Sequence, residues 1–407
     1  MAELIEQAYE VAVEVLRLCL HEKGIKAAEA YYPQVWARDG VIASFGALLI
    51  DDAAFDRACR ASLELLAGSM NDVGHVANCL PVDVEYTPGV NNAVDSNCWL
   101  IIGHWYYWKL RRNADFASAA LPDLRRAARW LRYQDWNDCG LLEVHECSDW
   151  ADLFANRYNA LGPNVLYAMA LRCLGELCEA AGEPDAREYA DAATDVIEKI
   201  NTILWLPENA DLREETLQEL WRSNGEWGHV YAQMSSLLWC RPYYLPYVEF
   251  RTVGDDRLDT LGNLYAVLFG VADEAKADLI LDYIRDYGVA RPYPCKACYP
   301  PVLPGHPDWR EYYRNRGYSQ PHSAHNGGIW PFIGGFYVAA LAACGRVGDA
   351  LAELEVLARA NEQDDWSFNE LLHGESGRPI GARHQAWSAA MYVAAYKAAV
   401  EGVSLFC

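Results

Sequence analysis

Apolar residues recur with the period of an α-helix along almost the whole chain, whereas the strict alternation typical of strands is nearly absent. The segment "DFASAALPDLRRAARWLRYQ" is an example, because it places Leu121, Leu124, Ala128 and Leu131 on one face. The segment "NVLYAMALRCLGELCEAAG" has the same character and ends at Gly182, a residue type that commonly stops a helix. The pattern therefore predicts an all-helical protein of about a dozen helices.

These helices are expected to come in antiparallel pairs. The helix predicted at residues 164–182 is followed directly by a second one at residues 183–204, and similar pairs fit residues 38–69, 260–287 and 327–361. Neither a linker rich in proline and serine nor a low-complexity segment divides the chain. We therefore expect a single domain that spans all 407 residues.

The composition is that of a globular protein with an acidic surface. Of the 407 residues, 52% are hydrophobic and 22% are charged, and the formal net charge is −23. Such a charge repels phosphate backbones and anionic lipids, so neither a nucleic-acid partner nor a membrane role is expected. The N-terminal segment interleaves Leu4, Ala8, Val11, Val15 and Leu18 with glutamates, which predicts an amphipathic helix rather than a signal peptide. We expect a soluble, cytoplasmic protein, and the sequence leaves homo-oligomerisation open.

Cofactor and metal signatures are weak or absent. Neither a phosphate-binding GxxxxGK[ST] motif nor a dinucleotide-binding GxGxxG motif occurs. The thirteen cysteines lie mostly in apolar helical runs, and only Cys295 and Cys298 form a CxxC pair. A closed zinc site needs four ligands, and no second pair follows. We therefore expect no cofactor and no metal.

The loops between the predicted helices are rich in Trp, Tyr, Asp and Gly. Three of them place an acidic residue beside a tryptophan, namely "VWARDG" with Asp39, "NAVDSNCWL" with Asp95 and "SDWADLF" with Asp152, at steps of 56 and 57 residues. A helical hairpin with its return loop takes about that many residues. Similar loops follow at Asp259, His325 and Glu370, with one weak or missing member expected around residues 205–227. Six hairpins closed into a ring would bring these loops to one face.

A cleft lined by such loops suits a carbohydrate. Aromatic rings stack on the apolar faces of sugars, while carboxylates and arginines hydrogen-bond the hydroxyl groups. In "HNGGIWPF", Gly327 and Gly328 allow the backbone to approach a ligand closely, and Pro331 suits the first turn of an inner helix. Hydrolysis of a glycoside also needs two carboxyl groups, one protonated and one ionised, which the acidic loop residues can supply.

Several motifs resemble known glycosidases. The ordered set "CYPPVLPGHPDWR", "HNGGIWPF" and "FNELLHGESGRPIGARHQAWS" is similar to the C-terminal half of the alkaline/neutral invertases, and "YYPQVWARDG" and "VDSNCWLII" resemble their N-terminal motifs. "WAD" followed by "NVLYAMAL" is similar to the amylo-α-1,6-glucosidase domain of glycogen debranching enzymes. Both groups are six-hairpin glycosidases, so the resemblance implies an (α/α)6 barrel and an inverting hydrolase.

The resemblance also implies which carboxyl groups react. Asp152 stands at the general-acid position of the third loop, with Asp149 as its competitor, and Glu370 stands at the position of the general base, with Glu375 as the local alternative. The inverting mechanism places a water molecule between the two carboxyl groups, which are then about 6.5–9.5 Å apart.

Further residues are predicted to bind the sugar. Arg38 and Asp39 suit vicinal hydroxyl groups, although a salt bridge between hairpins is an equal alternative. His325 and Asn326 are placed at the rim of the cleft, with a weaker case for His322. The full set of predicted substrate-binding residues is Trp36, Arg38, Asp39, Asp95, Trp99, Asp149, Trp150, Arg157, His325, Asn326, Trp330, Gln385 and Trp387.

One departure from the invertases concerns the leaving group. The invertases carry "IDRRMG" in the third loop, and this chain has "ADLFANRYN" without the paired arginines. We therefore expect an exo-acting enzyme on a small α-glucoside, with sucrose, an α-1,6-linked glucoside and a glucosylated solute all open. A sugar epimerase or isomerase on the same barrel and a sugar-binding barrel without activity are the alternatives.

Overall fold

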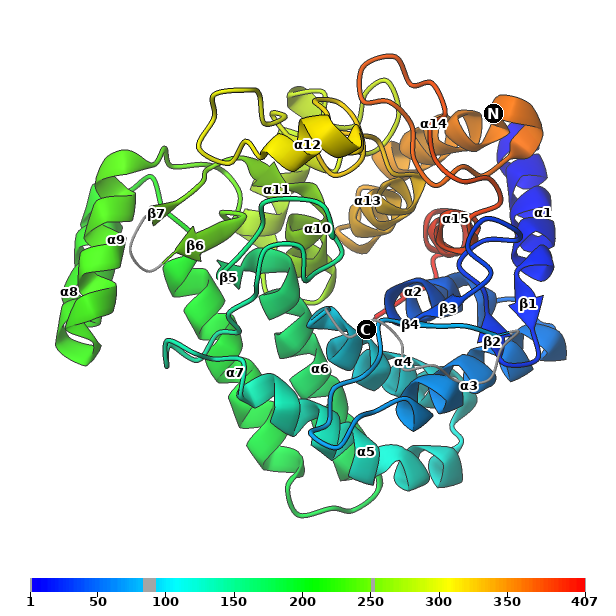
Figure 1. The fold of residues 1–407 in the computed structure, drawn as a ribbon, viewed down its shortest axis with the longest axis horizontal. Coiled ribbons are helices and arrows are strands. Elements are labelled where there is room, and N and C mark those ends of the chain that lie inside the picture. The colour runs from blue at the N-terminus through cyan, green and yellow to red at the C-terminus, as the bar shows by residue number, and fades with distance from the viewer. Residues whose placement is uncertain (1, 83–92, 250–252, 407) are drawn as a thin grey trace.

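The computed structural model describes residues 2–82, 93–249 and 253–406, and helices dominate it (Figure 1). Twelve of these helices form two concentric rings. The inner ring contains α2 (Ala37–Ala47), α4 (Asp95–Arg111), α6 (Leu161–Ala180), α10 (Thr260–Leu268), α13 (Pro331–Ala343) and α15 (Ala386–Ala399). The outer ring contains α1 (Ala2–Leu18), α3 (Ala53–Gly68), α5 (Ala114–Arg132), α7 (Ala186–Ile203), α11 (Glu274–Asp286) and α14 (Val347–Trp366).

The sequence explains which helices are inside. Helix α13, "PFIGGFYVAALAA", is buried without a break from Pro331 to Leu341, and every residue of α2 is buried. An outer helix such as α3 buries only one stripe, which includes Phe55, Cys59 and Leu66. Helices that are apolar all round need partners on every side, whereas amphipathic helices cover them from outside.

The ring closes through contacts between the two ends of the chain. Inner helix α2 packs against both α4 and α15, and the N-terminal helix α1 packs against α15 and α14. Tyr392 of α15 donates a hydrogen bond to the carbonyl of Ile5 in α1 at 3.2 Å. The first and last helices therefore form the sixth hairpin, and the fold is the (α/α)6 barrel that the sequence predicted.

Short strands lie mainly in the loops before the inner helices. The strands are β1 (Leu20–His21), β2 (Gly24–Ile25), β3 (Val35–Trp36), β4 (Cys79–Leu80), β5 (Asn159–Ala160), β6 (Tyr247–Glu249), β7 (Val253–Gly254), β8 (Leu258–Asp259) and β9 (Cys298–Tyr299). All pairs are antiparallel: β1 with β2, β3 with β4, β8 with β9, and β6 between β5 and β7. Strands β3, β5 and β8 lead directly into α2, α6 and α10, so they fix where these inner helices begin.

Two details of the sequence interpretation were wrong. Residues 205–227 do not belong to a weak seventh loop of the ring, because they contain α8 (Ala210–Ser223) and the start of α9 (Gly225–Leu237). These two helices pack on each other and project from one side of the barrel (Figure 1). In α1, Leu18 is 47% exposed, whereas Ala8 and Val15 of the predicted face are buried together with Ile5, Ala12 and Leu16. A further short helix, α12 (Glu311–Arg316), lies in the loop before α13.

Other local predictions are confirmed. Pro331 occupies the first turn of α13, and Gly327 before it has a φ of +84°. Gly182 follows α6 with a φ of +72°, the left-handed conformation that ends a helix. Among the described residues, none of the helices is long and apolar enough to cross a bilayer.

Candidate active site

A pocket lies at the end of the barrel where α2, α13 and α15 begin. The space between its atoms, counted together with the open solvent at its mouth, is about 490 Å³. Its lining consists of Ala27, Tyr32, Trp36, Arg38, Asp39, Trp150, Asp152, Tyr318, His325, Trp330, Glu370, Gln385 and Trp387. Four of the loops that the sequence singled out, those of Asp39, Asp152, His325 and Glu370, therefore converge on this pocket from distant parts of the chain.

Both predicted catalytic carboxyl groups line this pocket. Asp152 lies in the loop before α6, and Glu370 lies in the loop between α14 and α15. Glu370 is only 7% exposed and is held by Ala382, whose N–H donates to Glu370 Oε2 at 3.0 Å. The Glu370 N–H donates in turn to the Ala382 carbonyl at 2.7 Å. This reciprocal pairing fixes one oxygen of Glu370 and leaves the other for a ligand.

Burial shifts the ionisation of the acidic residues in the pocket. The pKa of Glu370 is raised to about 7, chiefly because the group is desolvated and also because Asp39 and Asp152 lie nearby. Desolvation raises the pKa of Asp152 as well, against the opposing effect of the Arg38 charge. The pKa of Asp39 is raised to about 6 for the same reason. Glu370 and Asp39 can therefore hold protons close to neutral pH, as acid–base catalysis requires.

Five buried polar atoms of the lining residues have no hydrogen-bond partner in the protein. Four belong to groups that can donate, and these are Trp36 Nε1, Arg38 Nε, His325 Nδ1 and Trp387 Nε1, while Gln385 Oε1 accepts. Buried polar groups are almost always paired, because an unpaired one costs about 1–3 kcal/mol. These five atoms are therefore available to hydrogen-bond the polar groups of a ligand.

The Arg38 side chain connects two inner helices. Its Nη1 donates to Asp95 Oδ2 at 2.7 Å, and both side chains are nearly inaccessible. The salt bridge between hairpins that the sequence offered as an alternative is thus present, yet Arg38 also lines the pocket, and its Nε has no partner in the protein. Gln385 is linked to the same helix, since its Nε2 donates to Asp39 Oδ1 at 3.2 Å.

Asp95, Trp99 and Asp149 lie behind the pocket rather than in it. Together with Tyr265 they line a second, smaller chamber, and Trp150 lines both cavities. Asp149 Oδ1 accepts a hydrogen bond from the N–H of Ala151 at 2.9 Å, and burial raises its pKa to about 7. Of the two candidate acids, Asp152 is therefore the one that lines the pocket.

Two other residues that were predicted to bind the sugar instead hold loops in place. Asn326 is fully buried and uses its amide on the backbone of Val302 and Ser319, at 2.6 to 3.1 Å. Arg157 pairs with Asp308 and Glu249. Neither side chain lines the pocket. The rim position predicted for His325 also differs, because His325 is buried and its pKa is lowered to about 3 by desolvation and by Arg38.

Sequence reasoning missed three lining residues, Ala27, Tyr32 and Tyr318. Tyr32 belongs to the quoted "YYPQVWARDG" segment, so its position four residues before Trp36 was an available signal. No motif marks Tyr318, which reaches the pocket through the loop after α12. Desolvation and the nearby Glu370 raise the pKa of both phenols, so they stay neutral and able to donate hydrogen bonds.

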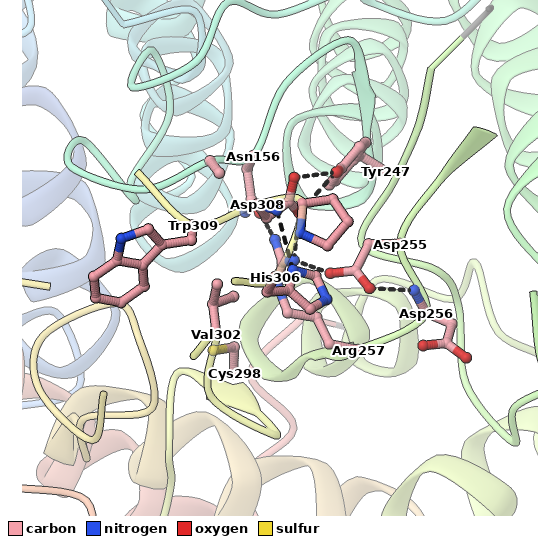
Figure 2. Close-up of polar contacts among 12 residues, drawn as sticks. Asn156, Tyr247, Asp255, Asp256, Arg257, Cys298, Val302, His306, Asp308 and Trp309 are labelled. Carbon is pink, nitrogen blue, oxygen red and sulfur yellow. Dashed lines mark hydrogen bonds and ion pairs between the residues drawn. The ribbon is translucent and has the colours of Figure 1, made fainter. Parts of the chain in front are cut away.

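A group with metal-ligand spacing lies outside the pocket. Ligand atoms of Asp255, His306 and Asp308 are all within 4.8 Å of one another. The Arg257 guanidinium, however, donates to both carboxylates and lies between them (Figure 2). Because this cation already balances the acidic pair, the group is an ion-pair network. Cys295 and Cys298, the other pair weighed as ligands, are free buried thiols.

Comparisons with known proteins agree with the fold. The chain superimposes on the GH63 mannosylglycerate hydrolase of Thermus thermophilus in complex with glucose with a TM-score of 0.70, covering 95% of this chain and 98% of that one at 14% identity. A rhamnosidase from Klebsiella oxytoca with rhamnose bound gives a TM-score of 0.68, covering 98% and 64% of the two chains at 16% identity. The chain has the fold of the six-hairpin glycosidases.

In sequence, the chain is similar to invertases. The profile of the alkaline and neutral invertase family matches residues 248–401. Neutral/alkaline invertase 1 of Oryza sativa is 31% identical over 144 residues, which are 34% of this chain and 22% of that protein. An alkaline/neutral invertase of Arabidopsis thaliana is 24% identical over 335 residues, 74% of this chain and 56% of that protein. The alignments thus span less than two thirds of these curated relatives.

Proposed function

We propose that the protein is an inverting, exo-acting glycoside hydrolase that acts on a small α-glucoside. The observation that carries this proposal is that Asp152 and Glu370 line one pocket together with five unpaired buried polar atoms. The carboxyl groups supply the acid and the base, and the unpaired atoms supply partners for sugar hydroxyl groups. The invertase-like sequence and the glycosidase fold support the same reaction class.

The lining also favours a neutral sugar over a charged one. Its charged residues are the Arg38 guanidinium and the three carboxyl groups of Asp39, Asp152 and Glu370, and Arg38 is already paired with Asp95. A sugar phosphate would meet net negative charge there. Four tryptophans in the lining supply aromatic surfaces for the apolar faces of a sugar ring. Sucrose, an α-1,6-linked glucoside and a glucosylated solute remain the candidate substrates.

In the proposed reaction, Asp152 donates its proton to the glycosidic oxygen while the bond from that oxygen to the anomeric carbon breaks. Glu370 removes a proton from a water molecule, whose oxygen attacks the anomeric carbon from the opposite face. The products are the free alcohol and a sugar of inverted anomeric configuration. Asp152 thus loses a proton to the alcohol, and Glu370 gains one from the water molecule. Proton exchange with solvent then returns Asp152 to its protonated form and Glu370 to its ionised form.

One observation favours the reverse assignment of the two roles. In the free protein, burial raises the pKa of Glu370 to about 7, so Glu370 itself holds a proton close to neutral pH, and burial raises the pKa of Asp152 as well. For Asp152 to act as the acid, Asp152 must carry a proton and Glu370 must have lost its own when the substrate is bound. The alternative is that Glu370 protonates the leaving group and Asp152 activates the water.

Two variants test the proposal and the assignment together. Asp152→Asn and Glu370→Gln should each lower the rate on the cleaved α-glucoside by ~100-fold or more, since general acid–base catalysis contributes ~100- to 10,000-fold. Glucosyl fluoride needs no protonation of its leaving group, so Asp152→Asn should retain activity on it and Glu370→Gln should not. The opposite pattern would reverse the roles, and full activity of both variants would refute the proposal. Glu375→Gln, on the exposed turn nearby, serves as the control.

The alternatives have less support from the pocket. An epimerase that works with histidines would need a basic imidazole, and His325 is the one histidine of the lining, with a pKa lowered to about 3. A barrel that only binds sugar would keep its ligand after either carboxyl group is replaced. Binding without any release of glucose by the unaltered protein would therefore favour it.

A further inference from the structure

Asp308 lies at the centre of a buried network outside the pocket, in the "PGHPDWR" motif. It is 1% exposed and accepts hydrogen bonds from the Tyr247 hydroxyl at 2.7 and 2.8 Å, from Arg257 Nη1 at 2.7 Å and from Arg157 Nη1 at 2.9 Å. Figure 2 shows Asp308 gathered with Tyr247, Arg257 and Asn156. Although burial opposes it, these donors lower the pKa of Asp308, which is therefore ionised.

The two arginines connect Asp308 to the loop that carries Asp152. Arg157 Nη1 also donates to the Ala155 carbonyl at 2.8 Å. Arg257 Nη2 donates to Asn156 Oδ1 at 3.0 Å, and its guanidinium lies 4.9 Å from the centre of the Phe154 ring. The Ala155 carbonyl and the Asn156 side chain, three and four residues after Asp152, are thus tied to Asp308 through two charged hydrogen bonds.

The rest of the segment around Asp308 holds the same loop at other points. Ser319 Oγ donates to the Leu153 carbonyl at 2.9 Å. On the other side of Asp152, Glu146 accepts from Arg310 Nε at 3.0 Å and from the Tyr312 hydroxyl at 2.6 Å. The hydrogen bonds found among the described residues therefore hold the loop on both sides of Asp152, through the Leu153 carbonyl and the Glu146 side chain.

We propose that Asp308 is a positioning residue that sets the place of the Asp152 carboxyl group through Arg157 and Arg257. The inference rests on the proposed function, in which Asp152 protonates the leaving group. Proton transfer depends steeply on position, and a displacement of about 1 Å can cost ~100-fold in rate. An asparagine at 308 can accept hydrogen bonds through one oxygen only. Its NH2 group would face Tyr247 or the two arginines, which donate to Asp308 in the unaltered protein. The loop is then held by weaker, uncharged bonds.

The test compares two substrates of Asp308→Asn. One is the α-glucoside that the unaltered protein cleaves, and the other is glucosyl fluoride, which needs no proton from Asp152. We expect kcat for the glucoside to fall by ~10- to 100-fold with KM changed by less than ~3-fold, while kcat for the fluoride stays within ~3-fold. A general loss of structure would lower both rates equally, so the ratio of the two rates separates positioning from folding.

Two further variants complete the design. Tyr247→Phe removes one donor to Asp308 without changing any charge, so it should show the same substrate pattern with a smaller effect, and it decides the matter if Asp308→Asn does not fold. Glu353→Gln alters another buried carboxylate, which accepts two hydrogen bonds from Arg291 far from the loop, and it should leave the ratio unchanged.

The outcomes separate the two proposals. If the unaltered protein cleaves both substrates and the folded variants lose activity on both equally, or lose none, the role of Asp308 is overturned and the proposed function stands. If the unaltered protein releases glucose from neither substrate, the proposed function falls, and the role of Asp308 falls with it.

Discussion

Replacing Glu370 by glutamine should make the protein more stable than the unaltered protein at pH 8, because the variant avoids a loss of unfolding free energy that the unaltered protein suffers as the pH rises. The pKa of Glu370 is raised in the folded protein from 4.5 to about 7, chiefly by burial. Between these values the unfolded chain has lost the proton and the folded protein still binds it, so rising pH favours unfolding. At about 1.4 kcal/mol for each tenfold change in proton affinity, the penalty reaches about 3 kcal/mol above pH 7. A glutamine carries no such penalty, and its oxygen can still accept from the N–H of Ala382.

The assay is urea unfolding of both proteins at pH 4 and pH 8, followed by tryptophan fluorescence. From pH 4 to pH 8 the unaltered protein should lose about 3 kcal/mol more unfolding free energy than Glu370→Gln does. Glu375→Gln, whose carboxyl group is largely exposed, should behave like the unaltered protein. Parallel pH dependence of the unaltered protein and Glu370→Gln would refute the reasoning, because it would mean that Glu370 ionises equally in both states.

The remaining predictions concern rate, binding and packing. If Glu370 is the base it must be ionised, so kcat/KM should fall below about pH 7 in a pH–rate profile, and an alkaline limb there instead would contradict its role. Trp36→Phe removes an indole N–H that has no protein partner, so KM should rise ~5-fold, about 1 kcal/mol, with the melting temperature nearly unchanged. Gly46→Ala would place a Cβ 2.0 Å from the Ala390 carbonyl oxygen between α2 and α15 and should cost ~1–3 kcal/mol or more of stability in urea unfolding. Gly68→Ala has no atom within 4 Å of its Cβ and should leave stability unchanged or slightly raised.

The helical period of the apolar residues predicted an all-helical chain, the spacing of the acidic loops suggested six hairpins, and the resemblance to six-hairpin glycosidases implied the barrel. Helices such as α13 are apolar all round, and helices such as α3 are amphipathic. Within each hairpin, this difference predicts which helix belongs to the inner ring. The period says nothing about which hairpins join the ring. Helices α8 and α9 have the same kind of pattern, yet they pack on each other outside it.

The site was predictable only where a residue type and its loop position agree. Asp152 and Glu370 were predicted from their motifs, and the structure brings both into one pocket. Asp149 lies only three residues from Asp152 but borders the inner chamber. Trp150 stands between the two residues in the chain and lines both cavities. The local sequence does not encode which of the two cavities each carboxyl group lines.

Polar residues that support loops look like ligands in a sequence. Asn326 stands in the most constrained motif of the chain, yet its amide completes the backbone hydrogen bonding of Val302 and Ser319. Tyr318 shows the reverse case, since it lines the pocket without any motif. Its place depends on contacts between segments far apart in the chain, such as the bond from Ser319 to Leu153.

The most direct test of the account is proton NMR of the protein with sucrose, isomaltose, trehalose and glucosylglycerate in turn, with the anomeric signals recorded from the first minutes. We predict that β-glucose appears first from one of these α-glucosides, and that neither Asp152→Asn nor Glu370→Gln produces it. Early α-glucose from sucrose or glucosylglycerate, whose leaving groups are not glucose, would contradict inversion. No release of glucose from any of the four would contradict the assignment as an α-glucoside hydrolase.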